Sequence, residues 1–208
     1  MDGVFMRKYW NRIGICLITA VLFWIGGLIA DRQLLRQELV RLHVVAASDS
    51  EEDQRLKLRV RDAILESLQS DMEKLTDAEA AKAYLQENLP KIEGVANRVL
   101  REAGCTDLAA ASLAVEEFST RVYDTFSLPA GIYDTLRITI GEGEGHNWWC
   151  VVFPSLCLPA TAEGFAEAAS CAGFPEELTA ALEGEEGYEI RFYFLDLIGR
   201  IENLLREE

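Results

Sequence analysis

The residue types that could do chemistry are concentrated in the segment 141–159, GEGEGHNWWCVVFPSLCLP. Six residues separate Cys150 from Cys157. That spacing is too wide for the CxxC pairs of zinc and redox sites and suits a local disulfide across a bend. With Cys105 and Cys171, the four cysteines after the N-terminal segment allow three pairings. We favour a Cys150–Cys157 disulfide, which needs an oxidising compartment, and leave Cys105 and Cys171 either free or paired with each other.

Two catalytic interpretations of this segment are weaker. A Cys150 thiolate could be activated by His146, but residues four apart on a strand are about 13 Å apart and meet only if the glycine turn folds back. The glycines at 141, 143 and 145 lack the Lys-Ser/Thr of a phosphate-binding loop, and Trp148 and Trp149 follow them in a predicted strand. On a strand, neighbouring tryptophans point to opposite faces, so one can enter a core while the other lies on a surface.

A second group of polar residues lies between positions 43 and 62. Asp49 and Asp53 could be imagined as a hydrolytic pair, but both stand beside a predicted helix start and are explained as capping residues. Arg59 and Asp62 are three apart and can pair on a helix surface. The sequence contains two histidines, His43 and His146. Together with the carboxylates and cysteines nearby, they supply too few ligands for a metal centre. We therefore expect no metal site, no cofactor and no enzymatic activity.

An N-terminal segment predicts export. Three basic residues at positions 7, 8 and 12 precede residues 13–30, which carry no charge. At about 1.5 Å per residue this segment is roughly 27 Å long, enough to cross a hydrocarbon core as a signal peptide or an uncleaved anchor. Leu28 occupies the minus-three position before Ala30, where cleavage sites prefer a small residue, so we favour an anchor. The charge bias places the N-terminus in the cytoplasm and Asp31 onward outside.

The exported part is acidic. The chain has 20 basic and 35 acidic residues. Three of the basic residues and one of the acidic residues lie in residues 1–30. The exported part therefore has 17 basic and 34 acidic residues, a net charge of −17. This balance argues against nucleic acid or anionic lipid as a partner over most of the surface. It names no partner, because an acidic surface also serves solubility.

The first half of the exported part is predicted to be mostly helical. Residues 31–38 form a juxtamembrane helix or linker, and residues 39–45 a strand. Ser50, followed three positions later by Asp53, predicts a helix start, and that helix runs to about Gln69. A second helix spans 76–87 from Thr76, Pro90 breaks it, and a third spans 91–103.

The second half is predicted to be richer in strands. Residues 111–123 form one strand, and residues 133–140 and 148–153 form a hairpin across the glycine-rich turn. Residues 161–187 read as short helices or a poorly ordered excursion, 188–195 as a strand and 196–205 as a closing helix. The prediction is one exported α+β domain over 39–208, after a linker at 31–38 and a signal peptide or anchor at 1–30. Its antiparallel sheet has four or five strands, with helices mainly on one face.

Two segments carry a family resemblance. RLHVVAASDSEEDQRLKLRVRDAILESL at 41–68 and LPAGIYDTLRITIGEGEGHNWWCVVFPSLCL at 128–158 resemble stage II sporulation protein R of endospore-forming bacteria. The family's Asn-Trp-Trp-Cys stands at 147–150, its Phe-Pro at 153–154 and its Leu-Cys at 156–157. Its Arg-Leu-His-Val stands at 41–44, its Ser-Asp-Ser at 48–50 and its Asp-Gln at 53–54. Residues 159–187, Cys105 and Cys171 lie outside these motifs.

The resemblance implies a signalling protein that is exported across the forespore membrane into the space between the two sporulation membranes, either anchored or secreted. Its expected partner is a membrane-embedded aspartic protease, stage II sporulation protein GA, which processes pro-sigma factor E in the mother cell. An exported hydrolase using Cys150 or a carboxylate pair, and a structural cell-envelope protein, remain alternatives. The expected partner-binding residues, each with core packing or capping as its other explanation, are His43, Asp49, Asp53, Arg61, Asn147, Trp148 and Trp149.

Overall fold

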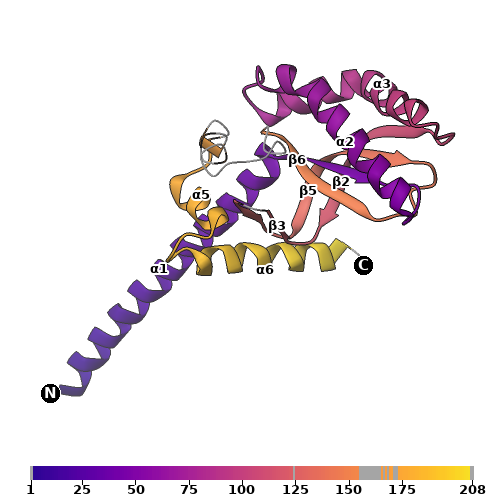
Figure 1. The fold of residues 1–208 in the computed structure, drawn as a ribbon. Helices are drawn as coiled ribbons and strands as arrows, with labels where there is room; N and C mark the ends of the chain where they lie inside the picture. The colour runs from indigo at the N-terminus through magenta and orange to yellow at the C-terminus, as the bar shows by residue number, and fades with distance from the viewer. Residues whose placement is uncertain are drawn as a thin grey trace.

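The computed structural model describes residues 2–123, 125–154, 165, 167, 169–170 and 173–206. The elements follow in the order α1 (Asp2–Glu38), β1 (Val40–Val45), α2 (Glu51–Met72), α3 (Ala78–Glu102), β2 (Ala109–Phe118), β3 (Arg121–Val122), β4 (Ser127–Leu128), β5 (Gly131–Ile140), β6 (Asn147–Phe153), α5 (Glu176–Glu183) and α6 (Glu189–Arg206). Figure 1 shows α1 projecting from a folded body in which helices and a sheet are layered. The predicted α+β class and the N-terminal apolar helix are confirmed.

The main sheet has four strands in the order β2-β5-β1-β6. β1 runs parallel to β5 and antiparallel to β6, and β2 runs antiparallel to β5. The predicted strand number is confirmed, but the sheet is mixed where we predicted an antiparallel one. Strands β3 and β4 form a separate two-stranded ribbon.

The predicted hairpin between residues 133–140 and 148–153 is wrong, because β1 lies between β5 and β6. The glycine-rich turn passes over the end of β1, where the amide of Gly145 donates to the carbonyl of Ala46 at 3.0 Å. A Cβ at Gly145 would collide with the carbonyl of Ser48, so glycine permits this close crossing. Alternation in two sequence-adjacent strands cannot show that a distant strand inserts between them.

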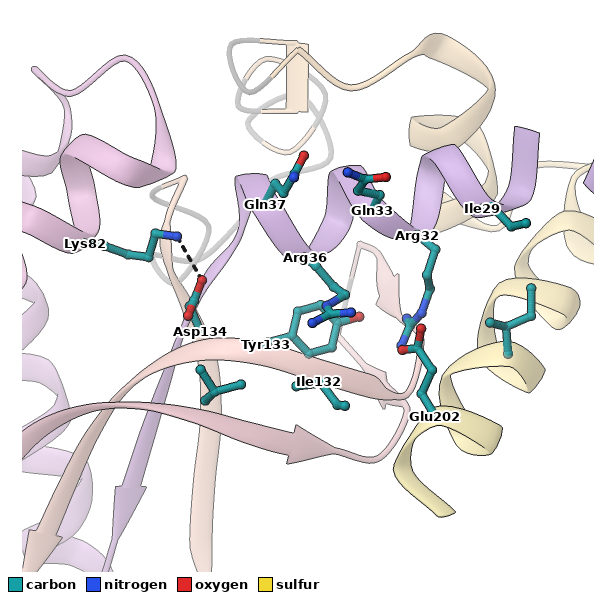
Figure 2. Close-up of a pocket in the computed structure, with 12 residues that line it drawn as sticks. Ile29, Arg32, Gln33, Arg36, Gln37, Lys82, Ile132, Tyr133, Asp134 and Glu202 are labelled. Carbon is teal, nitrogen blue, oxygen red and sulfur yellow. Dashed lines mark hydrogen bonds and ion pairs between the residues drawn. The ribbon is translucent and has the colours of Figure 1, made fainter. Parts of the chain in front are cut away.

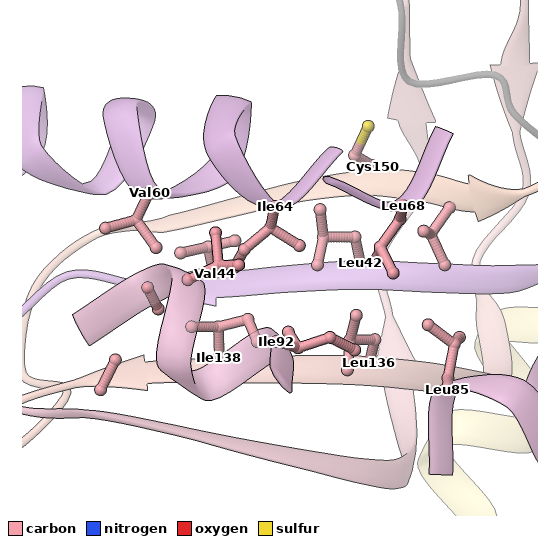
Figure 3. Packing of buried hydrophobic residues seen from close by; sticks show 14 of the residues in the cluster. Leu42, Val44, Val60, Ile64, Leu68, Leu85, Ile92, Leu136, Ile138 and Cys150 are labelled. Atoms are coloured by element: carbon pink, nitrogen blue, oxygen red, sulfur yellow. The ribbon is translucent and has the colours of Figure 1, made fainter. Parts of the chain in front are cut away.

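One face of the sheet carries the first core (Figure 3). Alternate residues of the central strands point to this face, and the apolar stripes of α2 and α3 cover them. Each fully buried aliphatic side chain contributes about 1.5–3 kcal/mol by leaving water. Members of this core shown in Figure 3 are Leu42, Val44, Val60, Ile64, Leu68, Leu85, Ile92, Leu136, Ile138 and Cys150.

The opposite face carries a second core, so helices cover both faces and not mainly one. The C-terminal part of α1 packs here together with residues of β5, β6, α5 and α6. Residues 31–38, expected as a juxtamembrane linker or helix, are the last two turns of α1. Buried members of this core include Leu28, Leu35, Leu39, Phe118, Tyr133, Val151, Phe165, Leu178 and Leu195.

Helix α2 begins as predicted, since the side chain of Ser50 accepts a hydrogen bond from the amide of Asp53 at 3.1 Å. Helix α3 corrects two predictions. Its N-cap is Asp77, not Thr76, and it continues through Pro90 without a break. The buried stripe from Leu85 to Ile92 spans the proline, so packing on the sheet outweighs the lost backbone hydrogen bond.

The predicted strand at 188–195 is also wrong, because those residues form the first part of α6. Isoleucine, phenylalanine and tyrosine give this segment a high strand propensity. However, Leu195 and Gly199, four residues apart, are both buried, which is helical spacing. Tertiary packing has therefore decided the conformation against local propensity.

Among the described residues, one helical stretch, Arg12–Glu38, is long and apolar enough to cross a membrane. The apolar side chains of this stretch are largely exposed before Leu28. Leu28 is the first that is buried against the domain, and Ile29 after it is still exposed on the other side of the helix. The membrane-length segment thus continues into the second core without a break in the helix (Figure 1).

Candidate functional site

The sheet separates the two tryptophans, as strand alternation predicted. Trp148 lies opposite Val44 of β1 and faces α2, while Trp149 lies opposite His43 and faces the second core. The seven residues predicted to bind a partner are consequently divided between two faces of the domain. None of these placements tests partner binding itself.

The face toward α2 presents an arginine on an indole ring. The guanidinium of Arg61 lies 4.2 Å from the ring centre of Trp148 and forms an ion pair of 2.6 Å with Asp62. Trp148 remains 37% exposed, so this contact does not bury it in the core. A partly exposed arginine on an exposed indole can offer a cation, a π face and donor groups to a partner at once.

Next to it, the loop before β6 is tied to the entrance of α2. Asp49 accepts hydrogen bonds from both the ring Nδ1 and the backbone amide of His146, the latter at 2.6 Å. These bonds hold the pKa of Asp49 below its ordinary value of 3.8. The contact that His146 makes is therefore with the carboxylate of Asp49.

Lys57 is a member of this site that the sequence prediction did not select. Its ammonium donates to the carbonyl of His146 at 2.9 Å and to Oε1 of Gln54 at 2.6 Å, and the residue is buried. Burial lowers the pKa of Lys57, while the charge of Asp49 opposes this shift. The signal for it was faint, since a lysine on the edge of an apolar helical stripe usually extends to solvent.

Asn147 and Asp53 have simpler surroundings. Asn147 is exposed at the first position of β6, opposite Val45, where strand alternation places it on the same face as Trp149 and not with Trp148. Asp53 supplies the capped amide and also accepts a hydrogen bond from the hydroxyl of Ser48. The residue that caps α2 is Ser50, and the carboxylate of Asp53 bonds a hydroxyl instead of a helix amide, which corrects its predicted capping role.

On the opposite face, His43 and Trp149 belong to an aromatic cluster. Their rings stack at 5.5 Å, and the guanidinium of Arg121 lies 3.5 Å above the indole. His43 Nδ1 contacts Glu116 at 2.7 Å, and Arg137 donates to the same carboxylate at 3.0 Å. Burial raises the pKa of Glu116, but the hydrogen bond and charge of His43, with those of Arg137, outweigh it and lower the pKa.

Arg41 is fully buried beside this cluster, and the sequence prediction missed it. It donates to the hydroxyl of Tyr123 at 2.8 Å, and its guanidinium lies 4.0 Å from the ring centre of Phe118. An inward arginine on a strand alternating with valine and leucine is the signal that could have found it. His43 and Arg41 are therefore parts of a polar and aromatic interior, in agreement with the packing explanation for His43.

The predicted Cys150–Cys157 disulfide lies partly outside the described residues, because these end at Pro154 before the next described position, 165. Cys150 is buried in the first core, opposite Leu42. Among the described residues there is no cluster of three or more potential metal ligands.

A cleft of about 490 Å³ lies between α1, β5 and α6 (Figure 2). Its charged groups are mostly paired, since Arg32 contacts Glu202 at 2.9 Å and Lys82 contacts Asp134 at 3.0 Å. Figure 2 shows Tyr133 and Arg36 between these two pairs. The cleft is therefore a polar seam between α1 and the domain.

Comparisons with known proteins agree with the motifs. The family model for stage II sporulation protein R matches residues 36–163. Stage II sporulation protein R of Bacillus subtilis (strain 168) is 34% identical over 124 residues, which cover 60% of this chain and 55% of that protein. The matched region thus spans little more than half the length of this curated relative. No solved structure matches the chain.

The matched range runs from the end of α1 through β6, so it contains the whole main sheet, α2, α3 and all seven predicted site residues. Helices α5 and α6 and most of α1 lie outside it. Because the model matches more than half of the chain, the chain belongs to the stage II sporulation protein R family.

Proposed function

We propose that this chain is a protein ligand exported from the forespore that activates a membrane-embedded aspartic protease of the stage II sporulation protein GA type. The activated protease would then process pro-sigma factor E in the mother cell. Family membership supports a role in sporulation, and the family is described as a sporulation protein and not as an enzyme.

The observation that carries this proposal is the stacked pair of Arg61 and Trp148 inside the family segments, in which the indole is exposed and the arginine is partly exposed. Arginine and tryptophan are over-represented among the residues that dominate binding energy at protein interfaces. Asp49 is exposed where His146 ties the loop before β6 to the entrance of α2, so it would extend the proposed contact surface. Asn147 is exposed next to Trp148 but on the other face of β6, so it would contribute at the margin of this surface. His43 and Trp149 would support this surface from the other side of the sheet.

The proposed mechanism is a population shift. A ligand changes the balance between an inactive and an active state of its partner only by binding the active state more tightly. Contact through the Arg61–Trp148 surface would stabilise the active form of the protease, and the ligand itself would undergo no reaction.

We further propose that the chain stays attached to the forespore membrane. Ala30, the candidate cleavage point, lies inside a continuous helix, and its neighbours Leu28 and Asp31 are buried against the domain. A protease needs an extended and accessible substrate, which this packing opposes once the domain has folded. The Cys150–Cys157 disulfide is proposed for the oxidising space outside that membrane.

Co-expression of the full chain with the protease and pro-sigma factor E in a host that lacks all three tests the proposal. Processed sigma factor should appear only when the chain is present, and Arg61→Ala and Trp148→Ala should reduce it strongly. Arg59→Ala is the matched control, because Arg59 is exposed on the same helix. Circular dichroism checks folding of each variant.

Processing that is independent of the chain would contradict the proposal and favour a structural role in the envelope. Equal losses in the Arg59→Ala and Arg61→Ala variants would contradict the proposed surface. Labelling of a reactive Cys150 thiol in the native protein, with substrate turnover by the purified chain alone, would instead support the hydrolase alternative.

A further inference from the structure

Helix α6 carries an apolar stripe that no described part of the domain covers. From Ile190 to Leu204 successive members are three or four residues apart, and Leu205 follows Ile201 by four, so all six share one face of the helix. Their exposure ranges from 37% at Leu197 to 70% at Leu205. The stripe consists of Ile190, Tyr193, Leu197, Ile201, Leu204 and Leu205.

The stripe points away from the domain. Leu195 and Gly199 are buried on the other side of the helix, and a Cβ at Gly199 would overlap the carbonyl of Ala130. At 100° per residue, these two positions lie about opposite the centre of the stripe. A helix packed on a water-exposed domain normally has polar residues on its outer face. The outer face of α6 is apolar instead.

The charged residues of α6 lie on the flanks and are paired within the protein. Arg191 contacts Asp31 at 2.7 Å, Glu202 contacts Arg32 at 2.9 Å, and Arg200 contacts Asp196 at 2.7 Å. Two of these pairs join α6 to α1, so they fix the rotation of α6 relative to the membrane-length helix. No charged side chain interrupts the stripe between Ile190 and Leu205.

Helix α6 starts beside the apolar part of α1. The rings of Trp24 and Phe194 meet edge to face with centroids 4.9 Å apart. Trp24 lies six residues before Ala30, the end of the uncharged segment, a rise of about 9 Å along the helix. Figure 1 shows α6 along the underside of the folded body, on the side toward which the N-terminal half of α1 projects.

We propose that α6 lies on the outer surface of the bilayer that α1 spans, with its stripe inserted between lipid headgroups and acyl chains. The proposal rests on the proposed retention of α1 as an anchor. Interfacial helices typically bury their apolar face about 5–10 Å into this zone, which agrees with the depth of Trp24 below the end of the uncharged segment.

The exposed apolar surface of α1 and that of the stripe meet at Trp24 and Phe194, and this continuity favours lipid as the occupant of both. The acidic charge of the exported part does not oppose it, because the stripe itself is uncharged and insertion depends on apolar burial. Zwitterionic lipid is therefore sufficient.

The test is photo-cross-linking of the full chain reconstituted in phosphatidylcholine vesicles. The photoreactive amino acid p-benzoylphenylalanine is placed at Leu197 or Leu204 on the stripe, at Leu22 in α1, or at Val122, which is 80% exposed on β3. We expect lipid adducts at Leu197, Leu204 and Leu22 that are several-fold more abundant than at Val122. Circular dichroism of each sample confirms the fold.

Each other outcome overturns the inference in a distinguishable way. If lipid adducts form at Leu22 but those at Leu204 do not exceed the level at Val122, then α1 is anchored in the bilayer and α6 does not lie on it. Cross-links from Leu204 to a second copy of the chain would show an interface between copies. Absence of lipid adducts at Leu22 as well would remove the retained anchor on which this inference rests, while the proposed activation of the protease would still be tested by the co-expression experiment.

Discussion

At the scale of single residues, the contacts of Lys57 make it the link between α2 and the loop that carries His146. Replacement Lys57→Met keeps the buried aliphatic chain but removes the donor, so the carbonyl of His146 loses its hydrogen bond. A hydrogen bond from a charged donor contributes about 1.5–3 kcal/mol, and we expect the free energy of unfolding to fall by up to that amount. Urea denaturation measures this, with the exposed Lys74→Met as the control.

A loss no larger than that of Lys74→Met would mean that water replaces the lysine and that the loop is held by Asp49 alone. Signalling of the Lys57→Met variant would report whether the position of this loop matters to the proposed contact surface.

Glu116 should make stability depend on acid pH. Its pKa is lower in the folded chain than its ordinary value of 4.5, so its ionised form stabilises the fold above that value. This contribution is lost as the pH falls through the lowered pKa, because the folded carboxylate must then be protonated. We expect Glu116→Gln to flatten the fall of the melting temperature between about pH 5 and pH 3, measured by circular dichroism.

An unchanged acid limb in Glu116→Gln would show that other carboxylates determine the acid sensitivity. Glu79→Gln, an exposed position in the first turn of α3, controls for the removal of one negative charge.

At the scale of elements, Pro90 removes a backbone donor from the middle of α3 at an exposed position. Since each helical amide bonds the carbonyl four residues before it, the acceptor left without its helical donor is the carbonyl of Gln86. Pro90→Ala should restore the hydrogen bond to the carbonyl of Gln86 and raise the free energy of unfolding by about 1–3 kcal/mol. Thermal unfolding measures the gain, and a loss of stability would show that the packing of α3 requires the proline.

The elements also show what the sequence could predict. The start of α2 followed from Ser50 and Asp53, because a cap is a local interaction between residues three apart. The strand faces followed from alternation, which correctly separated Trp148 from Trp149. The insertion of β1 between β5 and β6 depends on pairing between residues 94 positions apart for β5 and more than a hundred apart for β6, which local periodicity does not contain.

For the candidate site, the sequence likewise predicted local features but not contacts between distant segments. Arg61 and Trp148 stand out as residue types, but their contact depends on where α2 crosses β6. Lys57 and Arg41 were missed because their burial is decided by neighbours from distant segments, such as His146 and Tyr123. Propensity also misassigned residues 188–195, where an apolar outer stripe hid the helical period.

At the scale of the whole molecule, α1 is both the membrane-length helix and part of the second core. Leu35 is fully buried there, so Leu35→Ala should lower the free energy of unfolding by about 2–5 kcal/mol through lost burial and the cavity left behind. Denaturation of the full chain in detergent measures it, and the exposed Gln37→Ala is the control. Equal stabilities of the two variants would mean that α1 merely rests on the domain.

The unbroken course of α1 has a consequence for how its length can vary. Each residue added or removed between Trp24 and Leu35 turns everything before it by 100° relative to the domain. Such a change would carry the ring of Trp24 out of register with Phe194, or Leu35 out of its cavity. A change of seven residues, close to two full turns, restores the helical phase but moves everything before it by about 10.5 Å along the axis, so the orientation of the N-terminal part is kept while Trp24 itself leaves Phe194.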